Sequence, residues 1–364
     1  MNITNVINCI EKHFPLYLQD NYDHSGAQLI VDQCPVNKIL LCFDVTEEVM
    51  NEAIEQDANL IISHHPLLFT GIKEINTKTE KGRIIEKAFK HSISIYAIHT
   101  NLDNHPEGIN YMIASKLNLN SIKTLSPIQI NPVKLIVFTP LSHVSTIQDS
   151  LFAAGAGNIG NYSECSYNLN GYGTFKANEL ANPFVGKKNE RHSEEEVRTE
   201  VIVPKDSLNE VIQKMRAVHP YEEPAFDIIP LENTYNKGGA GIIGNLSTAL
   251  TEKEFLNLTK SVFGINHLRH SKLTNKPIQR IAACGGSGSS LIEKAINEKA
   301  EVFITGDIKY HTFEEFGKHI LLLDIGHYES EIHGLKIIFD LLIKNFPTFA
   351  IRFSEKSVNP VYYY

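Results

Sequence analysis

The chain has 364 residues, 42% of them hydrophobic and 21% charged, which is the composition of a globular protein with room for two or three domains. It carries 34 Lys and Arg against 42 Asp and Glu, a formal net charge of −8, and it has no run of five basic residues, so nucleic acid is disfavoured as a partner. No apolar stretch approaches about 18 residues, so we expect no membrane span.

Short apolar runs alternate with helix-length segments in the first third of the chain. The predicted strands are 38–44, 59–63 and 94–98, and the predicted helices are 46–56 and 79–91. Because these strands are continuously apolar instead of alternating, they are typical of strands that are covered on both faces in an α/β architecture.

The middle of the chain has a different character. Its predicted strands are 133–139, 173–175, 196–203 and 226–230, its predicted helices are 145–154 and 206–218, and 177–195 is predicted as a surface loop. This β-α-β-β-α-β order is the ferredoxin-like plan, and a segment of this size can fold alone. We therefore expect an inserted α+β domain at 132–231, with 233–241 leading the chain back.

The last third repeats the plan of the first. Predicted strands at 280–284, 301–305 and 319–323 alternate with a helix at 289–299 and a helical turn at 312–316. The segments around 57–68 and 299–310 match in pattern, which favours two related α/β halves that form one main lobe, although generic βα units look alike. The expected domains are 1–131, 132–231 and 232–364.

The 16 histidines are the unusual part of the composition, and several of them follow predicted strands. His64 and His65 follow the strand at 59–63. His99 and Asp103 follow the strand at 94–98. The strand at 319–323 is followed by Asp324, His327 and Glu331. In open parallel sheets ligands bind beyond the carboxyl ends of the strands, and imidazole with carboxylate suits zinc, manganese, iron or cobalt.

Two ions fit this pattern better than one. His327 and Glu331 are spaced i, i+4 and share a helix face, whereas the adjacent His64 and His65 point apart and cannot chelate one ion in the same way. A pair of ions about 3.5–4 Å apart is typical of hydrolytic centres. A lone histidine at a strand end is usually structural, but three such strand ends together favour a metal site.

Several further residues have weaker signals. His99, Asp307 and His311 are interpreted as groups that orient ligands or contact substrate. Residues 285–290 are either a phosphate-binding glycine loop or a tight βα turn. The His219–Pro224 segment is a rigid turn whose carboxylates face either solvent or a neighbour.

Four motifs resemble the NIF-three-like family, whose members are often named GTP cyclohydrolase 1 type 2 homologs. They are SHHPLLF at 63–69, AIHTNLDN at 97–104, TGDIKYH at 305–311 and DIGHYESE at 324–331. The middle segment, with AGAGNIGNYSECSY at 154–167 and HPYEEPAFDIIPL at 219–231, resembles the PII/CutA-like domain of the longer bacterial members.

The resemblance implies a dinuclear metal centre, usually zinc, in a toroidal homohexamer whose openings are capped by the inserted domains. The implied ligands are His64, His65, Asp103, His327 and Glu331, with Glu331 as the bridge. The chain departs from the family at Asp307 and Tyr310, where Glu and His are common, and at His24, where Asn is common.

The leading hypothesis is a metal-dependent hydrolase that acts on a small nucleotide-like or phosphorylated substrate, with His99 or His311 moving protons. The alternative is a regulatory or chaperone-like metal-binding ring whose inserted domain senses a ligand without catalysis. A DNA-binding ring is disfavoured by the acidic charge balance.

The five cysteines (Cys9, Cys34, Cys42, Cys165 and Cys284) form no CxxC pair, and the first residues lack the features of a signal peptide. We interpret the cysteines as reduced packing residues and expect a cytoplasmic protein.

Overall fold

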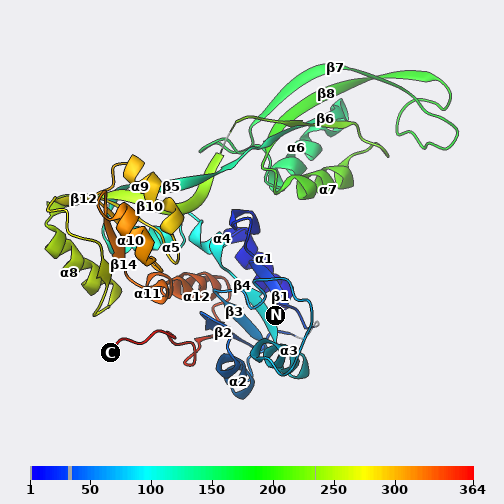
Figure 1. Cartoon of the computed structure of the whole chain (residues 1–364). Helices are drawn as coiled ribbons and strands as arrows, with labels where there is room; N and C mark the ends of the chain where they lie inside the picture. Colours follow the sequence, from blue (N-terminus) through cyan, green and yellow to red (C-terminus); the bar gives the residue numbers. More distant parts are fainter. Residues whose placement is uncertain (1, 32–34, 234) are drawn as a thin grey trace. The chain divides into compact units, whose positions relative to one another are not determined.

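The computed structural model describes residues 2–31, 35–233 and 235–364, and the chain divides into two compact units. The main unit comprises residues 1–128 and 237–364, and the inserted unit comprises residues 129–236. In Figure 1 the main unit is built from both ends of the chain, blue to cyan and yellow to red, and the inserted unit is green.

The first sheet of the main unit has the strand order β1-β4-β3-β2-β15. The bounds are β1 (Gly26–Leu29), β2 (Lys38–Cys42), β3 (Leu60–Ser63), β4 (Ser94–Ala97) and β15 (Ala350–Phe353). β15, β2, β3 and β4 run parallel to their neighbours, while β1 pairs antiparallel with β4. Every residue of β3 and β4 is buried, as their continuous apolar character predicts.

The second sheet has the strand order β11-β14-β13-β12-β10-β5. The bounds are β5 (Asn120–Ile130), β10 (Tyr235–Leu250), β11 (Arg269–His270), β12 (Ile278–Ala283), β13 (Val302–Thr305) and β14 (Leu321–Asp324). β12, β13 and β14 are parallel, and β11 pairs antiparallel with β14. The run β11-β14-β13-β12 therefore has the same order and directions as β1-β4-β3-β2 in the first sheet.

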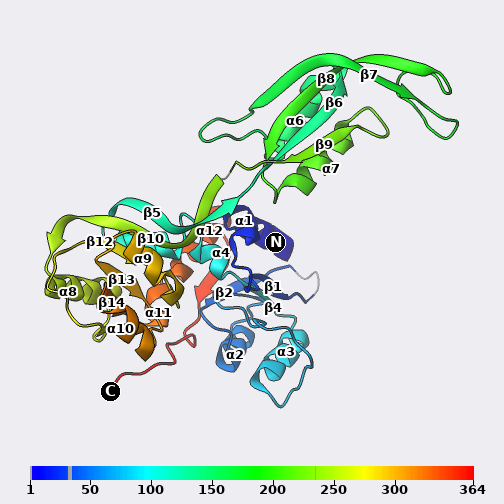
Figure 2. The ribbon, with the colours of Figure 1, turned by 45° about the horizontal axis from the view of Figure 1, so that its top comes forward.

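Helices cover both faces of both sheets. The helices that pack into a core shared by the two sheets are α1 (Ile3–His13), α5 (Ile109–Lys116), α8 (Glu252–Phe263) and α12 (Gly334–Asn345). The other face of the first sheet is covered by α2 (Glu47–Glu55) and α3 (Glu80–Lys90), and that of the second by α9 (Ile292–Asn297) and α10 (Tyr310–Phe316). Figure 2 shows α2 and α3 together on one side of the first sheet. The main unit is thus a mixed α/β structure.

The inserted unit is an α+β domain with one sheet of order β7-β8-β6-β9 in which all neighbours are antiparallel. Its elements are β6 (Val133–Pro140), α6 (Val144–Ala153), β7 (Ser166–Lys176), β8 (Arg191–Val203), α7 (Leu208–Val218) and β9 (Phe226–Pro230). Alternate strand residues such as Leu135 and Val201 pack with both helices on one face of the sheet.

Some elements differ from the sequence-based prediction. β7 and β8 extend well beyond the predicted strands, because their outer portions are polar and solvent-exposed and so lack an apolar pattern. The segment predicted to lead back at 233–241 instead begins β10. Gly239, at φ +142°, permits this, because a Cβ there would lie 2.1 Å from the carbonyl oxygen of Ser126. Residue 234 lies outside the described residues.

Four of the cysteines are free thiols, and Cys34 lies outside the described residues. Within the described part of the chain, no helix combines the length and the apolar character that crossing a bilayer requires.

Candidate metal centre

Three segments that are far apart in sequence meet in the main unit. His64 and His65 directly follow β3, and β4 leads through His99 into the short helix α4 (Thr100–Asp103), which ends at Asp103. β14 leads into the short helix α11 (His327–Glu331), which carries its first and last residues on one face. We call these residues the histidine–carboxylate cluster: His64, His65, His99, Asp103, His327 and Glu331.

The turn after β3 holds the two adjacent histidines by their backbones. The N–H groups of His64 and His65 donate to the carbonyl oxygens of Cys42 and Phe43, each at 3.0 Å. The Ser63 hydroxyl donates to the His65 carbonyl oxygen at 2.7 Å. These bonds continue the pairing of β2 with β3 beyond the sheet, so the imidazoles leave the strand end in fixed directions.

Glu331 lies at the centre of the cluster. Its Oε2 atom is 3.0 Å from Nε2 of His327, 3.4 Å from Nε2 of His64 and 3.6 Å from Nε2 of His65. Nε2 of His64 is also 3.8 Å from Oδ1 of Asp103. Three compact groups result among the described residues. Two of them share Glu331, one with His64 and Asp103 and the other with His65 and His327, and the third consists of His64, His65 and His99.

All four histidines use Nδ1 in the same way. Each Nδ1 lies within 3.0 Å of an oxygen that can only accept a hydrogen bond, so Nδ1 carries the proton of the neutral ring and Nε2 presents its lone pair. The partners are the Ile98 carbonyl for His64, Asp44 for His65, Asp23 for His99 and Asp307 for His327. Metal-ligating histidines in proteins are oriented in the same manner.

Several buried polar atoms of the cluster have no hydrogen-bond partner among the described residues. They are Nε2 of His64, Oδ1 of Asp103 and Oε2 of Glu331. In addition, Nε2 of His65 and Nε2 of His327 face each other at 3.3 Å. Lone pairs and carboxylate oxygens pointing at a common point repel one another unless a cation or a proton lies between them. The donor set therefore fits metal ions.

The pKa values of the cluster residues are shifted by the same crowding of lone pairs and carboxylate oxygens. Burial, reinforced by the negative charge of Glu331, raises the pKa of Asp103, whereas burial lowers the pKa of His64 to about 4. Burial also opposes charge on Glu331, but the neighbouring imidazoles of His327, His64 and His65 outweigh burial and hold the pKa of this carboxyl well below its usual range. Burial lowers the pKa of His65, but the neighbouring carboxylates of Asp44 and Glu331 outweigh burial and raise that pKa to about 10. Without a metal, protons therefore occupy part of the cluster.

The glycine loop after β12 makes room for the carboxylate of Glu331. A Cβ on Gly286, at φ +59°, would lie 2.1 Å from Oε1 of Glu331. The N–H groups of Gly286 and Gly288 donate to the hydroxyls of Ser330 and Thr305 at 2.9 and 2.8 Å. Because these donors are already used, the structure favours a tight turn over a phosphate-binding loop.

A cavity of about 370 Å³ opens onto the cluster. The rings of Tyr22 and Phe69 line it, with centroids 6.3 Å apart, and Phe69 lies 6.0 Å from the ring of His99. Among the described residues no lysine or arginine lines it. His311 is exposed on α10 and does not line this cavity, so the structure does not bring it to the cluster.

Two residues that orient histidines of the cluster were not assigned this role from the sequence. Asp44 follows β2 and could have been found by the strand-end argument that found the histidines. Asp23 lies in the loop before β1, and only the short distance from its Oδ1 to Nδ1 of His99, 2.7 Å, reveals its role. The carboxylate of Asp307 accepts a hydrogen bond from Nδ1 of His327 at 2.7 Å, which is compatible with the orienting role, one of the two roles expected for it.

Comparison with known proteins decides the family. The model of the Duf34/NIF3 (NGG1p interacting factor 3) family matches residues 1–360. The chain belongs to the Duf34/NIF3 family.

Curated relatives and solved structures agree over the full length. Proteins named "GTP cyclohydrolase 1 type 2 homolog" from Halalkalibacterium halodurans and Bacillus subtilis are 39% and 36% identical to this Duf34/NIF3 chain. The alignments cover 93% and 91% of this chain and 92% and 90% of theirs. The crystal structure of a Bacillus cereus protein related to NIF3 superposes with a TM-score of 0.86 at 33% identity, covering 100% of this chain and 99% of that one.

Proposed function

We propose that this chain holds two divalent transition-metal ions, most readily zinc, and uses them to hydrolyse a small nucleotide-like or phosphorylated molecule. The observation that carries the proposal is the set of unpartnered buried atoms that face a common point, on His64, Asp103 and Glu331. His64, Asp103 and Glu331 would hold one ion, and His65, His327 and Glu331 would hold the other. Such a pair, when bound, acts as a Lewis acid and lowers the pKa of water.

The residues around the cluster have separate tasks in this proposal. Asp23 keeps the proton of His99 on Nδ1, so Nε2 of His99 can accept a proton on the cavity side. His99 also places a ring nitrogen within 4.8 Å of ring nitrogens of His64 and His65, which makes it an additional candidate ligand. Tyr22 and Phe69 offer ring faces to a planar substrate group.

The names of the relatives suggest the opening of the guanine ring of GTP. Because no lysine or arginine among the described residues lines the cavity, a triphosphate has no cationic side chain there, and recognition in this chain falls to the planar base. Incubation of zinc-loaded protein with GTP, followed by proton NMR, tests the reaction: loss of the guanine C8 proton signal supports it. An unchanged spectrum beside a full complement of metal would refute GTP as the substrate and leave the metal centre standing.

His99 and His311 were both predicted to move protons, and a variant of each shows which of the two is needed for turnover. We expect His99→Gln to lower turnover more than tenfold, since it removes an oriented base, and His311→Gln to leave turnover within about twofold. Metal content measured on the same samples distinguishes a base from a ligand, because loss of an ion from His99→Gln assigns His99 to the metal.

A metal-binding regulatory or chaperone-like ring without catalysis is the second candidate. A cavity of about 480 Å³ inside the inserted unit favours it, because a unit with its own binding site can sense a ligand. If the unmodified chain turns over a substrate and the Glu331→Gln variant does not, the protein is an enzyme and this second candidate is excluded.

Several finer features are also proposals. We propose that the two sheets of the main unit are related halves, which their common strand order supports, and that the inserted unit is PII/CutA-like, which its β-α-β-β-α-β order supports. The free cysteines support a reducing, cytoplasmic location. The toroidal homohexamer predicts a native mass about six times the chain mass of 40.9 kDa, which light scattering measures.

A further inference from the structure

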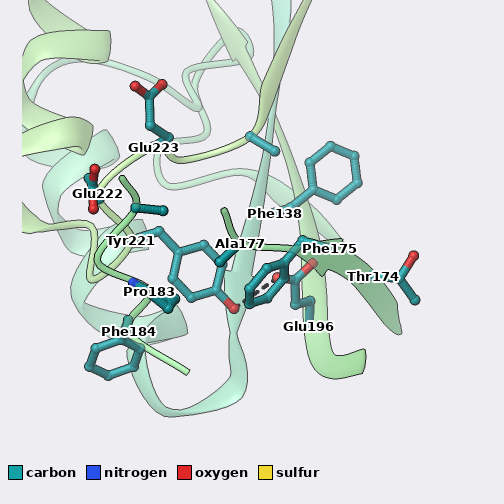
Figure 3. A pocket seen from close by; sticks show the side chains of 13 residues that line it. Phe138, Thr174, Phe175, Ala177, Pro183, Phe184, Glu196, Tyr221, Glu222 and Glu223 are labelled. Atoms are coloured by element: carbon teal, nitrogen blue, oxygen red, sulfur yellow. Dashed lines mark hydrogen bonds between the residues drawn. The ribbon is translucent and has the colours of Figure 1, made fainter. Parts of the chain in front are cut away.

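The inserted unit has a cavity of its own, about 480 Å³ in volume, within the range of small-molecule sites. The sheet contributes Phe138 from β6, Phe175 from β7 and Glu196 from β8. Gly173 and Thr174 of β7, the loop 177–190 and the turn 219–225 supply the rest of the wall. Figure 3 shows the side chains of this cavity, with the ring of Tyr221 next to Glu196.

Aromatic rings form much of the wall. The ring of Tyr221 lies 6.5 Å from that of Phe175 at 56° and 6.2 Å from that of Phe184 at 50°. Rings at these angles do not stack closely on one another, so parts of their faces remain available to a ligand. Ring faces carry partial negative charge and attract cations.

Three carboxylates accompany the rings: Glu196, Glu222 and Glu223. Within the described side chains none of them forms an ion pair with a lysine, arginine or histidine, and none of these basic residues lines the cavity. The nearest arginine along β8, Arg198, pairs instead with Glu200 at 3.0 Å. The cavity therefore combines negative charge with apolar surface and has no cation of its own.

Glu196 is held in place from two sides. The Tyr221 hydroxyl donates to its Oε1 at 2.9 Å, and a Cβ on Gly173 would lie 2.1 Å from its Oε2. The missing side chain at Gly173 leaves room for the carboxylate between the rings. Burial and the hydrogen bond to Glu196 raise the pKa of Tyr221, so the phenol remains a neutral donor.

The His219–Pro224 turn, which the sequence marked as rigid, positions two of the aromatic residues. His219 is 8% exposed, and its Nδ1 accepts from the N–H of Tyr221 at 3.1 Å. Its Nε2 therefore carries the proton and donates to the carbonyl oxygen of Phe138 at 3.1 Å. One buried imidazole thus ties the backbone of Tyr221 to that of Phe138, and the walls are set before a ligand arrives.

We propose that this cavity binds a small organic cation, an alkylammonium or arylalkylammonium compound, with its charged group at Glu196 and its apolar body against the aromatic rings. An anion would meet the carboxylate of Glu196 without a compensating cation from the lining residues. A neutral apolar molecule would desolvate Glu196 without replacing its hydration. A cation with an apolar body pairs its charge with Glu196 and packs its apolar part against the aromatic rings. This site is separate from the metal centre.

Three probes of nearly the same size and shape test the charge requirement: benzylammonium, benzyl alcohol and benzoate. Titration of the full chain, followed by NMR or calorimetry at neutral pH, should show benzylammonium binding at low millimolar concentration or tighter, about tenfold more tightly than benzyl alcohol, and no binding of benzoate. Equal affinities for the cation and the alcohol, or no binding of benzylammonium up to about 10 mM, would overturn the proposal.

Variants of two lining residues test whether benzylammonium binds in this cavity. Glu196→Gln keeps an acceptor for Tyr221 but removes the charge, and we expect it to weaken benzylammonium about tenfold. The matched control is Glu195→Gln, an equal charge change on the opposite face of the same strand, outside this cavity. Gly173→Ala should also weaken binding, because its Cβ would displace the carboxylate. Unchanged affinity in both Glu196→Gln and Gly173→Ala, with the metal content as in the unmodified chain, would refute the site.

Discussion

Replacing Glu331 by glutamine removes one negative charge from the centre of the cluster while preserving the size of the side chain. Its Oε2 lies within 3.6 Å of Nε2 of three histidines, and the side chain is 4% exposed, so water cannot take its place. A charge pair at about 4 Å is worth about 4 kcal/mol at an effective dielectric constant of about 20. That free energy corresponds to about a thousandfold loss of affinity for a divalent ion. Because Glu331 belongs to both groups of donors, we expect metal content to fall from two ions per chain to one or none.

Elemental analysis after dialysis, together with calorimetric titration of the chelator-treated protein with zinc, measures this effect. Glu329→Gln is the matched control, since it makes the same charge change on the same short helix at a residue that bonds to Asn359 outside the cluster. A Glu331→Gln variant that retains two ions with affinity near that of the unmodified chain would show that Glu331 does not bridge.

Three further predictions concern the surroundings of the cluster and the pH dependence of the fold. Gly286→Ala should displace the carboxylate of Glu331 and lower the metal content. Gly71→Ala is the control and should leave the metal content unchanged, because a Cβ there meets nothing within 4 Å. Equal metal content in the two variants would contradict a role of Gly286 in placing Glu331. Asp44→Asn should weaken zinc binding by about 10–100-fold, since Asp44 orients His65, and an unchanged calorimetric affinity would exclude this role. Burial lowers the pKa of His105 to about 4, below its unfolded value of about 6.5, so stability should fall as pH drops from 6.5 to 4. Urea unfolding should show that the free energy of unfolding falls by about 1–2 kcal/mol over this pH range, a value reduced because His105 is partly exposed. The fall should be smaller in His105→Gln. An equal dependence of the free energy of unfolding on pH in both proteins would contradict the role of His105.

The parallel strands of the main unit were the most predictable part of the fold. Buried strands such as β3 and β13 consist of four consecutive buried residues, and this pattern distinguishes them in the sequence. β10 was not predicted, because its start lies in a glycine-rich segment that pairs in a sheet only where tertiary contacts allow. The polar outer parts of β7 and β8 are stabilised by their pairing with each other, which a single-strand pattern does not show.

The strand-end argument pointed to segments that the structure brings together. Within the first sheet, the parallel strands β3 and β4 deliver the residues after them to the same edge. β14 belongs to the second sheet, so its meeting with them depends on how the two sheets pack, which the strand pattern does not show. The strand pattern also could not show which ring nitrogen faces the centre. That choice depends on the partners of Nδ1, and these come from loops, as with Asp23, or from a neighbouring strand end, as with Asp44. The exposed position of His311 could not be predicted either, because the sequence does not fix the rotation of the short helix α10 about its axis.

Anomalous diffraction at the zinc edge, from crystals of the purified chain grown with zinc, tests the central claim most directly. The account predicts two peaks, one between His64 and Asp103 and one between His65 and His327, with Glu331 adjoining both. A map without a peak among these side chains, or with a single peak that leaves Asp103 or His327 without a metal contact, would contradict it.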